Sequence, residues 1–185
     1  MSSPKISVPP PPPGGDAALY LNSLTDGELT RRYLAFYATA QAAPPQDPAL
    51  VELLRLRNGV AQSCEYCLSV RLVDDERFDR TLPERLLRFE GDDGFSPREK
   101  AALRLAEAFL TLPRSLSAEA RRELLAHFTP TEIVGLAVRL AAFLVNKPRA
   151  ALGIDAPLDP AGPVRIDPAA ALDRFQREAE SSADG

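Results

Sequence analysis

Residues 52–71 read ELLRLRNGVAQSCEYCLSVR and contain the only two cysteines of the chain, Cys64 and Cys67. Three residues is the separation at which two side chains share one helical face and can form or break a disulfide. A lone thiol pair at this spacing favours redox chemistry. Two cysteines and one histidine are too few for a disulfide framework or an all-cysteine zinc site. We therefore expect no metal and no cofactor.

Two features next to the cysteines would favour the thiolate, which is the reactive form of the side chain. Ser63 can act as a helix N-cap, which would place both cysteines in a first turn where unpaired N–H groups stabilise negative charge. Arg71 follows Cys67 by four residues and would share its face in a continuing helix. The alternative is that both cysteines are small buried apolar residues without chemistry.

Glu52 is the third residue of interest in this stretch. In one unbroken helix it would lie about 18 Å from Cys64, because an α-helix rises about 1.5 Å per residue. Asn58-Gly59 offers a place to bend such a helix. Glu52 therefore reaches the thiols only if the chain breaks or a second helix follows. The alternative is a surface charge that complements the helix dipole.

Helical patterns continue over most of the chain, and strand signals are nearly absent. Start signals of the capping type occur at Asp47, Ser96, Ser117 and Thr129, three of them followed directly by proline. The fold class predicted from these patterns is all-α. The expected helices run from Thr25 to about Ala40, from Pro48 toward the cysteines, and over residues 83–89, 97–111, 117–127, 133–145 and 167–180.

The 185 residues suit one domain with flanking segments. Residues 1–18 contain the run Pro9–Pro13 and are expected to form a disordered, proline-rich tail. Residues 19–160 are expected to form the helical domain. Residues 161–185 are expected to form a C-terminal helix and tail. The helix expected over 133–145 is apolar on almost every side, which is typical of a central helix or of one buried against another subunit.

Charge and hydropathy exclude several classes of partner. Lys and Arg number 22 against 26 Asp and Glu, a net charge of -4, which argues against nucleic acid and against an anionic membrane surface. No apolar run approaches the roughly 20 residues of a membrane span, and the N-terminal residues lack the apolar core of a signal peptide. We expect a cytoplasmic protein, in which a thiol pair stays reduced unless catalysis oxidises it.

Glu52, eleven intervening residues and then Cys64-x-x-Cys67 resemble the core of the carboxymuconolactone decarboxylase and alkylhydroperoxidase D (AhpD) superfamily. The later segment 146–154, NKPRAALGI, is also similar to segments of that superfamily. The likeness covers about residues 29–154. The superfamily pattern is a glutamate, a C-x-x-C pair and a histidine four residues after the second cysteine.

The resemblance implies an AhpD-like helical domain that assembles as a homo-oligomer, a trimer or hexamer. It also implies a thiol-dependent peroxidase that reduces hydroperoxides and is recharged by a dithiol reductant protein. By the same analogy Cys67 would attack the peroxide, Cys64 would be the resolving partner and Glu52 the proton acceptor. Arg71 and Tyr66 would be supporting residues.

Two positions depart from the pattern. Arg71 occupies the histidine position, and arginine stabilises a thiolate but cannot pass protons at neutral pH. Tyr66 stands between the cysteines, where the peroxidase branch can have histidine, and it could equally be a core or interface residue. Arg71 could instead be a solvated helix residue or a buried ion-pair partner of Glu52. The alternative function is a non-peroxidase oligomer of the same superfamily with inactive thiols, either binding a small molecule or acting as a decarboxylase-like lyase.

Overall fold

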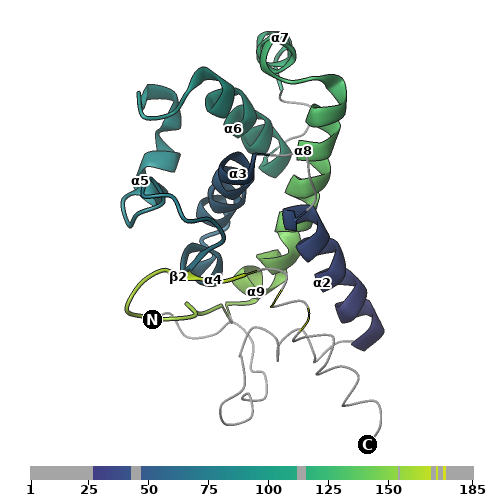
Figure 1. The fold of residues 1–185 in the computed structure, drawn as a ribbon, viewed down its shortest axis with the longest axis vertical. Helices are drawn as coiled ribbons and strands as arrows, with labels where there is room; N and C mark the ends of the chain where they lie inside the picture. The colour runs from purple at the N-terminus through teal and green to yellow at the C-terminus, as the bar shows by residue number, and fades with distance from the viewer. Residues whose placement is uncertain are drawn as a thin grey trace, which may run out of the picture.

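A computed structural model of the chain describes residues 27–42, 47–111, 116–153, 155–167, 170 and 173, which form a bundle of helices (Figure 1). The elements, in chain order, are α2 (Gly27–Ala42), α3 (Pro48–Ala61), α4 (Glu65–Leu68), β1 (Val70–Arg71), α5 (Leu82–Leu87), η1 (Phe89–Gly91), α6 (Pro97–Leu110), α7 (Ala118–His127), α8 (Pro130–Phe143), η3 (Leu144–Asn146), α9 (Lys147–Leu152) and β2 (Val164–Arg165).

Four helix starts predicted from capping residues are confirmed. Asp47 accepts hydrogen bonds from two N–H groups in the first turn of α3, and Ser117 accepts one at the start of α7. Ser96 and Thr129 form complete capping boxes with the glutamate three residues later, at the starts of α6 and α8. Each such cap contributes about 1 kcal/mol. The predicted cap at Thr25, the proline-rich segment and most of the predicted final helix lie outside the described residues.

Helix α3 is the centre of the bundle and packs against α4, α5, α6 and α8. Every residue from Leu50 to Gly59 is buried, so no face of this part of α3 meets solvent. Its leucines meet apolar side chains of α6 and α8 in the main core, and each fully buried leucine contributes roughly 1.5–3 kcal/mol. Glu52, Arg55 and Asn58 are buried in the same helix, and buried polar groups need hydrogen-bond partners. Those partners organise the region of the cysteines.

Helix α8 was predicted to be central or to be buried against another subunit. It packs against α2, α3 and α6 and buries Leu136, Leu140 and Phe143. Val134 and Val138, one turn apart on the same helix, are 63% and 49% exposed. One face of α8 is therefore in the core and another is open in the single chain.

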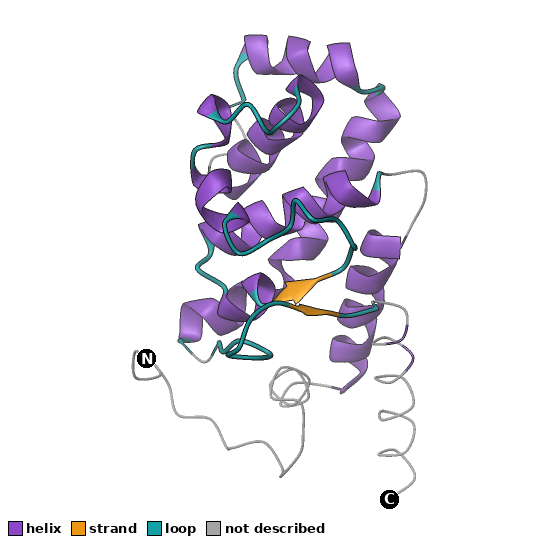
Figure 2. Ribbon diagram, turned by 60° about the vertical axis from the view of Figure 1, so that its left-hand side comes forward, coloured by secondary structure: helices purple, strands orange, loops and turns teal. Residues whose placement is uncertain are grey.

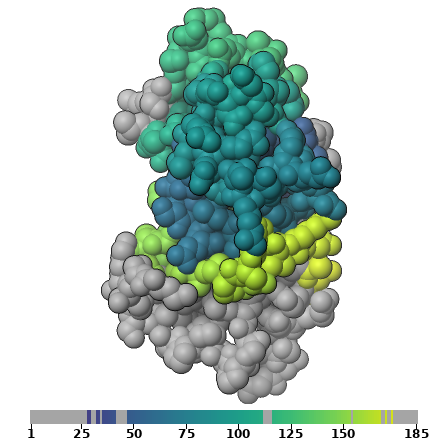
Figure 3. All heavy atoms as spheres, turned by 90° about the vertical axis from the view of Figure 1, so that its left-hand side faces the viewer, coloured from purple at the N-terminus to yellow at the C-terminus, as the bar shows by residue number. Residues whose placement is uncertain are grey.

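The all-α prediction is confirmed with one addition, a short parallel ladder between β1 and β2 (Figure 2). The Val164 N–H donates to the Ser69 carbonyl at 2.8 Å, and the Ile166 N–H donates to the Arg71 carbonyl at 2.9 Å. Strands of two residues are too short for the alternation that identifies a strand in a sequence. Figure 3 shows the surrounding segment 155–167 as a yellow-green band across the surface below the blue and teal helices. The predicted boundary at residue 160 stays a prediction, and the residues just beyond it pair with the strand that follows the cysteines.

Among the described helices, none alone has the length and apolar composition needed to cross a membrane. One pair, Ala118–His127 with Pro130–Leu152, meets those criteria together but is bent by 111° at its break.

Candidate active site

The chain reverses direction between α3 and α4. Helix α3 continues through Asn58-Gly59 to Ala61, so the bend expected there is absent. The reversal comes at Ser63, whose φ of 51° lies in the left-handed region that residues other than glycine seldom occupy. The Cys64 N–H then donates to the Gly59 carbonyl at 2.9 Å. A second helix, α4, follows and lies against α3, which is one of the two arrangements that the sequence left open.

Gly59 allows α4 to approach the backbone of α3 closely. A Cβ atom added at Gly59 would lie 3.0 Å from the Cβ of Cys67, tighter than nearly all real contacts of this kind. Glycine serves here because it has no side chain at a point of close approach. Its role is therefore to seat the second cysteine on α3 and not to bend the helix.

Cys64 and Cys67 form a disulfide with their Cα atoms 5.3 Å apart. Cys64 is fully buried and Cys67 is 4% exposed. Cys64 itself is the N-cap of α4, and its Sγ accepts the Cys67 N–H at 3.2 Å. The prediction that Ser63 is the N-cap is therefore wrong, because Ser63 occupies the left-handed turn one residue earlier. The peptide N–H favours negative charge on the Cys64 sulfur.

Glu52 forms a buried ion pair with Arg55. The Arg55 Nε and Nη2 atoms donate to the two carboxylate oxygens at 2.6 and 2.7 Å. The Leu72 N–H donates to the same carboxylate at 3.1 Å. The side chains are 1% and 3% exposed. Burial lowers the pKa of Arg55, but the charge and hydrogen bonds of Glu52 outweigh that effect and raise it, so the guanidinium stays charged.

Arg55 also connects this pair to the cysteine turn. Its Nη1 donates to the Cys67 carbonyl at 2.9 Å, and its Nη2 donates to the Val70 carbonyl at 2.8 Å. These carbonyls lie within and just beyond the short helix α4, where the backbone turns into β1. The Glu52–Arg55 pair of α3 therefore holds the backbone carbonyl of the second cysteine in place.

Arg71 is directed away from the sulfur atoms. Its Nε donates to the Phe78 carbonyl at 2.8 Å, and its Nη1 donates to the Leu68 and Val70 carbonyls at 2.9 and 2.8 Å. The expectation that Arg71 shares a helical face with Cys67 is wrong, because α4 ends before it and Arg71 lies in β1. The ion-pair partner of Glu52 is Arg55 and not Arg71. A supporting part for Arg71 in catalysis stays a prediction.

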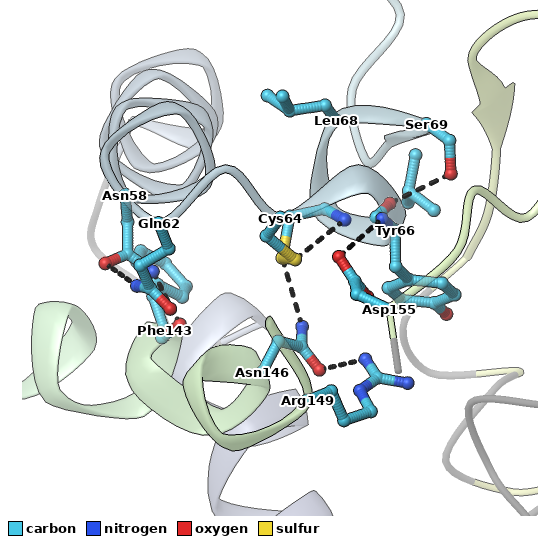
Figure 4. Close-up of a disulfide and its surroundings, with 12 residues drawn as sticks. Asn58, Gln62, Cys64, Tyr66, Leu68, Ser69, Phe143, Asn146, Arg149 and Asp155 are labelled. Carbon is cyan, nitrogen blue, oxygen red and sulfur yellow. Dashed lines mark hydrogen bonds between the residues drawn. A yellow bond between two sulfur atoms is a disulfide. The ribbon is translucent and has the colours of Figure 1, made fainter. Parts of the chain in front are cut away.

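Asn146 contacts the sulfur of Cys67 and was missed as a site residue. Its Nδ2 donates to Cys67 Sγ at 3.3 Å, and its Oδ1 accepts a hydrogen bond from Arg149 Nη2 (Figure 4). The Arg149 guanidinium carbon lies 4.8 Å from the centre of the Tyr66 ring, between the two cysteines in sequence. The one sequence signal for these residues was the likeness of segment 146–154 to the superfamily, which carried no role.

Asp155 binds the backbone between the cysteines. Its Oδ2 accepts the Tyr66 N–H at 3.3 Å, as Figure 4 shows, and its Oδ1 is buried with no hydrogen-bond partner in the described part of the chain. Burial raises the pKa of Asp155, and the Tyr66 N–H and the Arg149 charge oppose that rise. The cysteine turn is thus held by Arg55 from α3 and by Asn146, Arg149 and Asp155 from the region of α9.

This arrangement suits a dithiol–disulfide couple. The two sulfurs are already bonded, and each has its own hydrogen-bond donor, a peptide N–H for Cys64 and a side-chain amide for Cys67. Neither donor gives up its proton at neutral pH, so they stabilise charge and do not shuttle protons. Within the described part of the chain there is no cluster of three or more His, Cys, Asp or Glu side chains placed to bind a metal ion.

Comparison with solved structures identifies proteins that share this fold. A protein of unknown function from Agrobacterium tumefaciens, proposed to be the antioxidant defence protein AhpD, matches with a TM-score of 0.62 and 16% identity, over 76% of this chain and 97% of that chain. The debrominase Bmp8, solved as a cysteine-to-alanine variant with 2,3,4-tribromopyrrole, matches with a TM-score of 0.57 and 21% identity, over 81% and 78% of the two chains. The chain has the AhpD-like fold, and the resemblance to the carboxymuconolactone decarboxylase and AhpD superfamily is confirmed at the level of the fold.

Sequence comparison gives relatives without a known activity. No family model matches the sequence. The uncharacterized proteins MT2376 and Rv2313c of Mycobacterium tuberculosis, strains CDC 1551 / Oshkosh and ATCC 25618 / H37Rv, are each 34% identical over 113 residues. The match covers 60% of this chain and 40% of each relative, so the chain spans about two fifths of their length.

Proposed function

We propose that this protein is a thiol-dependent oxidoreductase that reduces hydroperoxides through Cys64 and Cys67. The observation that carries the proposal is the disulfide between these residues in an AhpD-like fold, with a separate hydrogen-bond donor on each sulfur. The predicted cytoplasmic location fits such a couple, because a reducing compartment supplies the dithiol that returns the pair to its thiol form.

The reaction balances with two thiols and one peroxide. The Cys67 thiolate attacks one peroxide oxygen, the O–O bond breaks, and the leaving alkoxide takes a proton to become an alcohol. Cys67 is then a sulfenic acid. The Cys64 thiol attacks its sulfur, the S–S bond forms, and the displaced hydroxide leaves as water with the thiol proton. A dithiol reductant restores both thiols by exchange and becomes oxidised itself.

Glu52 has a positioning role in this proposal, in place of the proton-acceptor role expected from the sequence. Its carboxylate is bound by Arg55 and by the Leu72 N–H, and through Arg55 it fixes the carbonyl of Cys67. The proton taken up by the leaving alkoxide then comes from water, because the donors on the two sulfurs are amide N–H groups. Turnover without an imidazole is the feature that separates this site from the superfamily pattern.

Reductive dehalogenation is the second candidate, favoured by the fold shared with a debrominase. The same dithiol would supply two electrons: a carbon–halogen bond is replaced by carbon–hydrogen, a halide and a proton leave, and the two thiols become the disulfide. The alternative function is an oligomer with inactive thiols that binds a small molecule or acts as a lyase. It requires no oxidation or reduction of the cysteines.

The test is thiol titration before and after one equivalent of peroxide. We expect the reduced chain to lose both thiols and to regain them with a dithiol. Cys67→Ser should consume no peroxide, and Cys64→Ser should stop at a sulfenic acid that a sulfenate-specific reagent traps. A brominated pyrrole in place of peroxide tests the second candidate. Thiols that stay unreactive toward both in the folded protein would reject both redox functions.

Assembly into a trimer or hexamer is part of the proposal. Val134 and Val138 of α8 are exposed in the single chain, and so is Phe36 of the adjacent α2. Such residues are suited to contact another copy. Light scattering on the eluting protein should give a mass of three or six chains, and Val138→Glu should reduce it. A mass of one chain for the unmodified protein would reject this part of the proposal.

A further inference from the structure

The sulfur of Cys67 receives a hydrogen bond from a side chain far away in sequence. Asn146 ends η3 and immediately precedes α9, and it is 6% exposed. Its amide nitrogen lies 3.3 Å from Cys67 Sγ (Figure 4). A buried amide directed at a sulfur is notable because its N–H groups could otherwise bond to backbone carbonyls, which are better acceptors.

The orientation of this amide is determined by Arg149. The Asn146 oxygen accepts a guanidinium N–H, so the nitrogen must face the sulfur. The reverse orientation would place N–H against N–H on one side and an oxygen against the sulfur on the other. Arg149 is itself buried and stacks on Tyr66. The donor is therefore locked to the same turn whose sulfur it contacts.

We propose that Asn146, oriented by Arg149, stabilises the Cys67 thiolate and so supports the reactivity that the missing histidine would provide in the superfamily. The inference rests on the proposed function, in which Cys67 is the attacking thiol. A hydrogen bond to a disulfide sulfur is weak, whereas one to a thiolate is charge-assisted and stronger. Asn146 thus acts as a positioning and charge-stabilising residue and leaves the transfer of protons to water.

The two sulfurs accept hydrogen bonds from different donors. Cys64 accepts the N–H of Cys67, which belongs to the same short turn. Cys67 depends on Asn146, which belongs to another part of the fold. Loss of Asn146 should therefore raise the pKa of Cys67 and leave that of Cys64 close to its value in the unmodified chain.

The experiment measures the Cys67 pKa in full-length Cys64→Ser protein, from the pH dependence of alkylation by iodoacetamide. We expect Asn146→Ala to raise this pKa by about one unit, which is roughly tenfold less thiolate at pH values below it. Asn146→Asp keeps the shape of the side chain and places a carboxylate at the sulfur, so the pKa of the Cys67 thiol should rise further in this variant. Asn58→Ala is the matched control, because Asn58 is also a buried amide but its Nδ2 donates to the Phe143 carbonyl; this change should leave the Cys67 pKa unchanged.

The outcomes separate this inference from the proposed function, because alkylation requires no hydroperoxide. A Cys67 pKa that stays the same in both Asn146 variants, or that rises equally in Asn58→Ala, would overturn the role of Asn146 even in an active peroxidase. A pKa that rises in the Asn146 variants alone supports that role, even if the unmodified protein consumes no peroxide. If Asn146→Ala does not fold, Asn146→Leu, which keeps the size of the side chain and removes its N–H donor, decides the result.

Discussion

Two buried arginines approach the cysteine turn from different helices and are partnered differently. Arg55 of α3 forms a two-point ion pair with Glu52 and donates to two backbone carbonyls. Arg149 of α9 binds a neutral amide and an aromatic ring, and among the described residues its Nε has no hydrogen-bond partner. Arg55 is neutralised by a carboxylate and bonded to backbone carbonyls, as is typical of a structural group. Arg149 is buried near the sulfur of Cys67 without a carboxylate bonded to it in the described part of the chain. The comparison indicates that Arg55 holds the backbone of the cysteine turn, whereas Arg149 orients the amide that contacts the sulfur of Cys67.

The largest effect is expected on the Arg55 side of the comparison. Arg55→Leu would leave the Glu52 carboxylate buried without its counter-charge and should lower the free energy of unfolding by about 3–5 kcal/mol. Urea denaturation measures this loss. Arg57→Leu is the control on the same helix, because its partner Glu107 is 43% exposed and would be solvated after the change. A loss for Arg55→Leu no larger than for Arg57→Leu would contradict the structural role of the Glu52–Arg55 pair.

Arg149→Leu should have a smaller effect on stability and a clearer one on chemistry. It removes a hydrogen bond and a cation–π contact, together worth about 2 kcal/mol. The freed Asn146 amide can then turn away, so the rate of alkylation of Cys67 at neutral pH should fall as well. Parallel denaturation and alkylation measurements test both parts. A stability loss equal to that of Arg55→Leu, with unchanged alkylation, would remove the distinction between the two arginines.

The helix starts could be read from the sequence because the information is local. Asp47, Ser96, Ser117 and Thr129 cap helices through bonds to N–H groups two or three residues away. The same reasoning failed at Ser63, which occupies a left-handed turn, so that Cys64 is the N-cap. The helix that follows has only four residues and ends at Leu68, before Arg71. The pattern gave no sign that the chain would reverse there, because serine seldom adopts that conformation.

The site could be predicted only in its centre. The cysteine pair and Glu52 were identified from spacing and resemblance, but the partners of Glu52 and Cys67 were not. In the sequence Arg55 is one of two arginines in its helix, and only the chain reversal brings the Cys67 carbonyl to it. Asn146 is joined to Cys67 by packing alone, and no periodicity within a single segment contains that contact.

Asp155 lies near Arg149, and a smaller effect is expected from its substitution, in the dependence of stability on pH. Burial raises its pKa in the folded chain, so its contribution to stability is present below the ordinary value of about 3.9 and is lost as pH rises through the raised value. Asp155→Asn should therefore be more stable than the unmodified chain at pH 7, by less than about 1 kcal/mol because the residue is half-buried and screened. The difference should vanish near pH 3. Equal stability at both pH values would contradict the raised pKa.

The smallest effect is expected for an arginine outside the site. Arg104 of α6 pairs with Glu90 and Glu123, and all three side chains are partly exposed. Exposed ion pairs contribute about 0–1 kcal/mol and weaken with salt. Arg104→Ala should therefore change the free energy of unfolding by less than about 1 kcal/mol, and less again in 1 M salt. A larger, salt-independent loss would show that burial is not what distinguishes Arg55 and Arg149.

The contacts of the cysteine turn also differ in how far along the chain they reach, which bears on folding order. Arg55 meets the Cys67 carbonyl across 12 residues, and the Leu72 N–H meets Glu52 across 20. Asn146 meets the Cys67 sulfur across 79 residues. Contacts close in sequence form with little loss of chain entropy, whereas distant ones wait for the rest of the fold. The contacts made by Glu52 and Arg55 around the cysteine turn thus lie within residues 52–72, whereas Cys67 acquires its amide donor only when η3 and α9 dock. The reactivity of that thiol is therefore a natural reporter of whether the whole domain has folded.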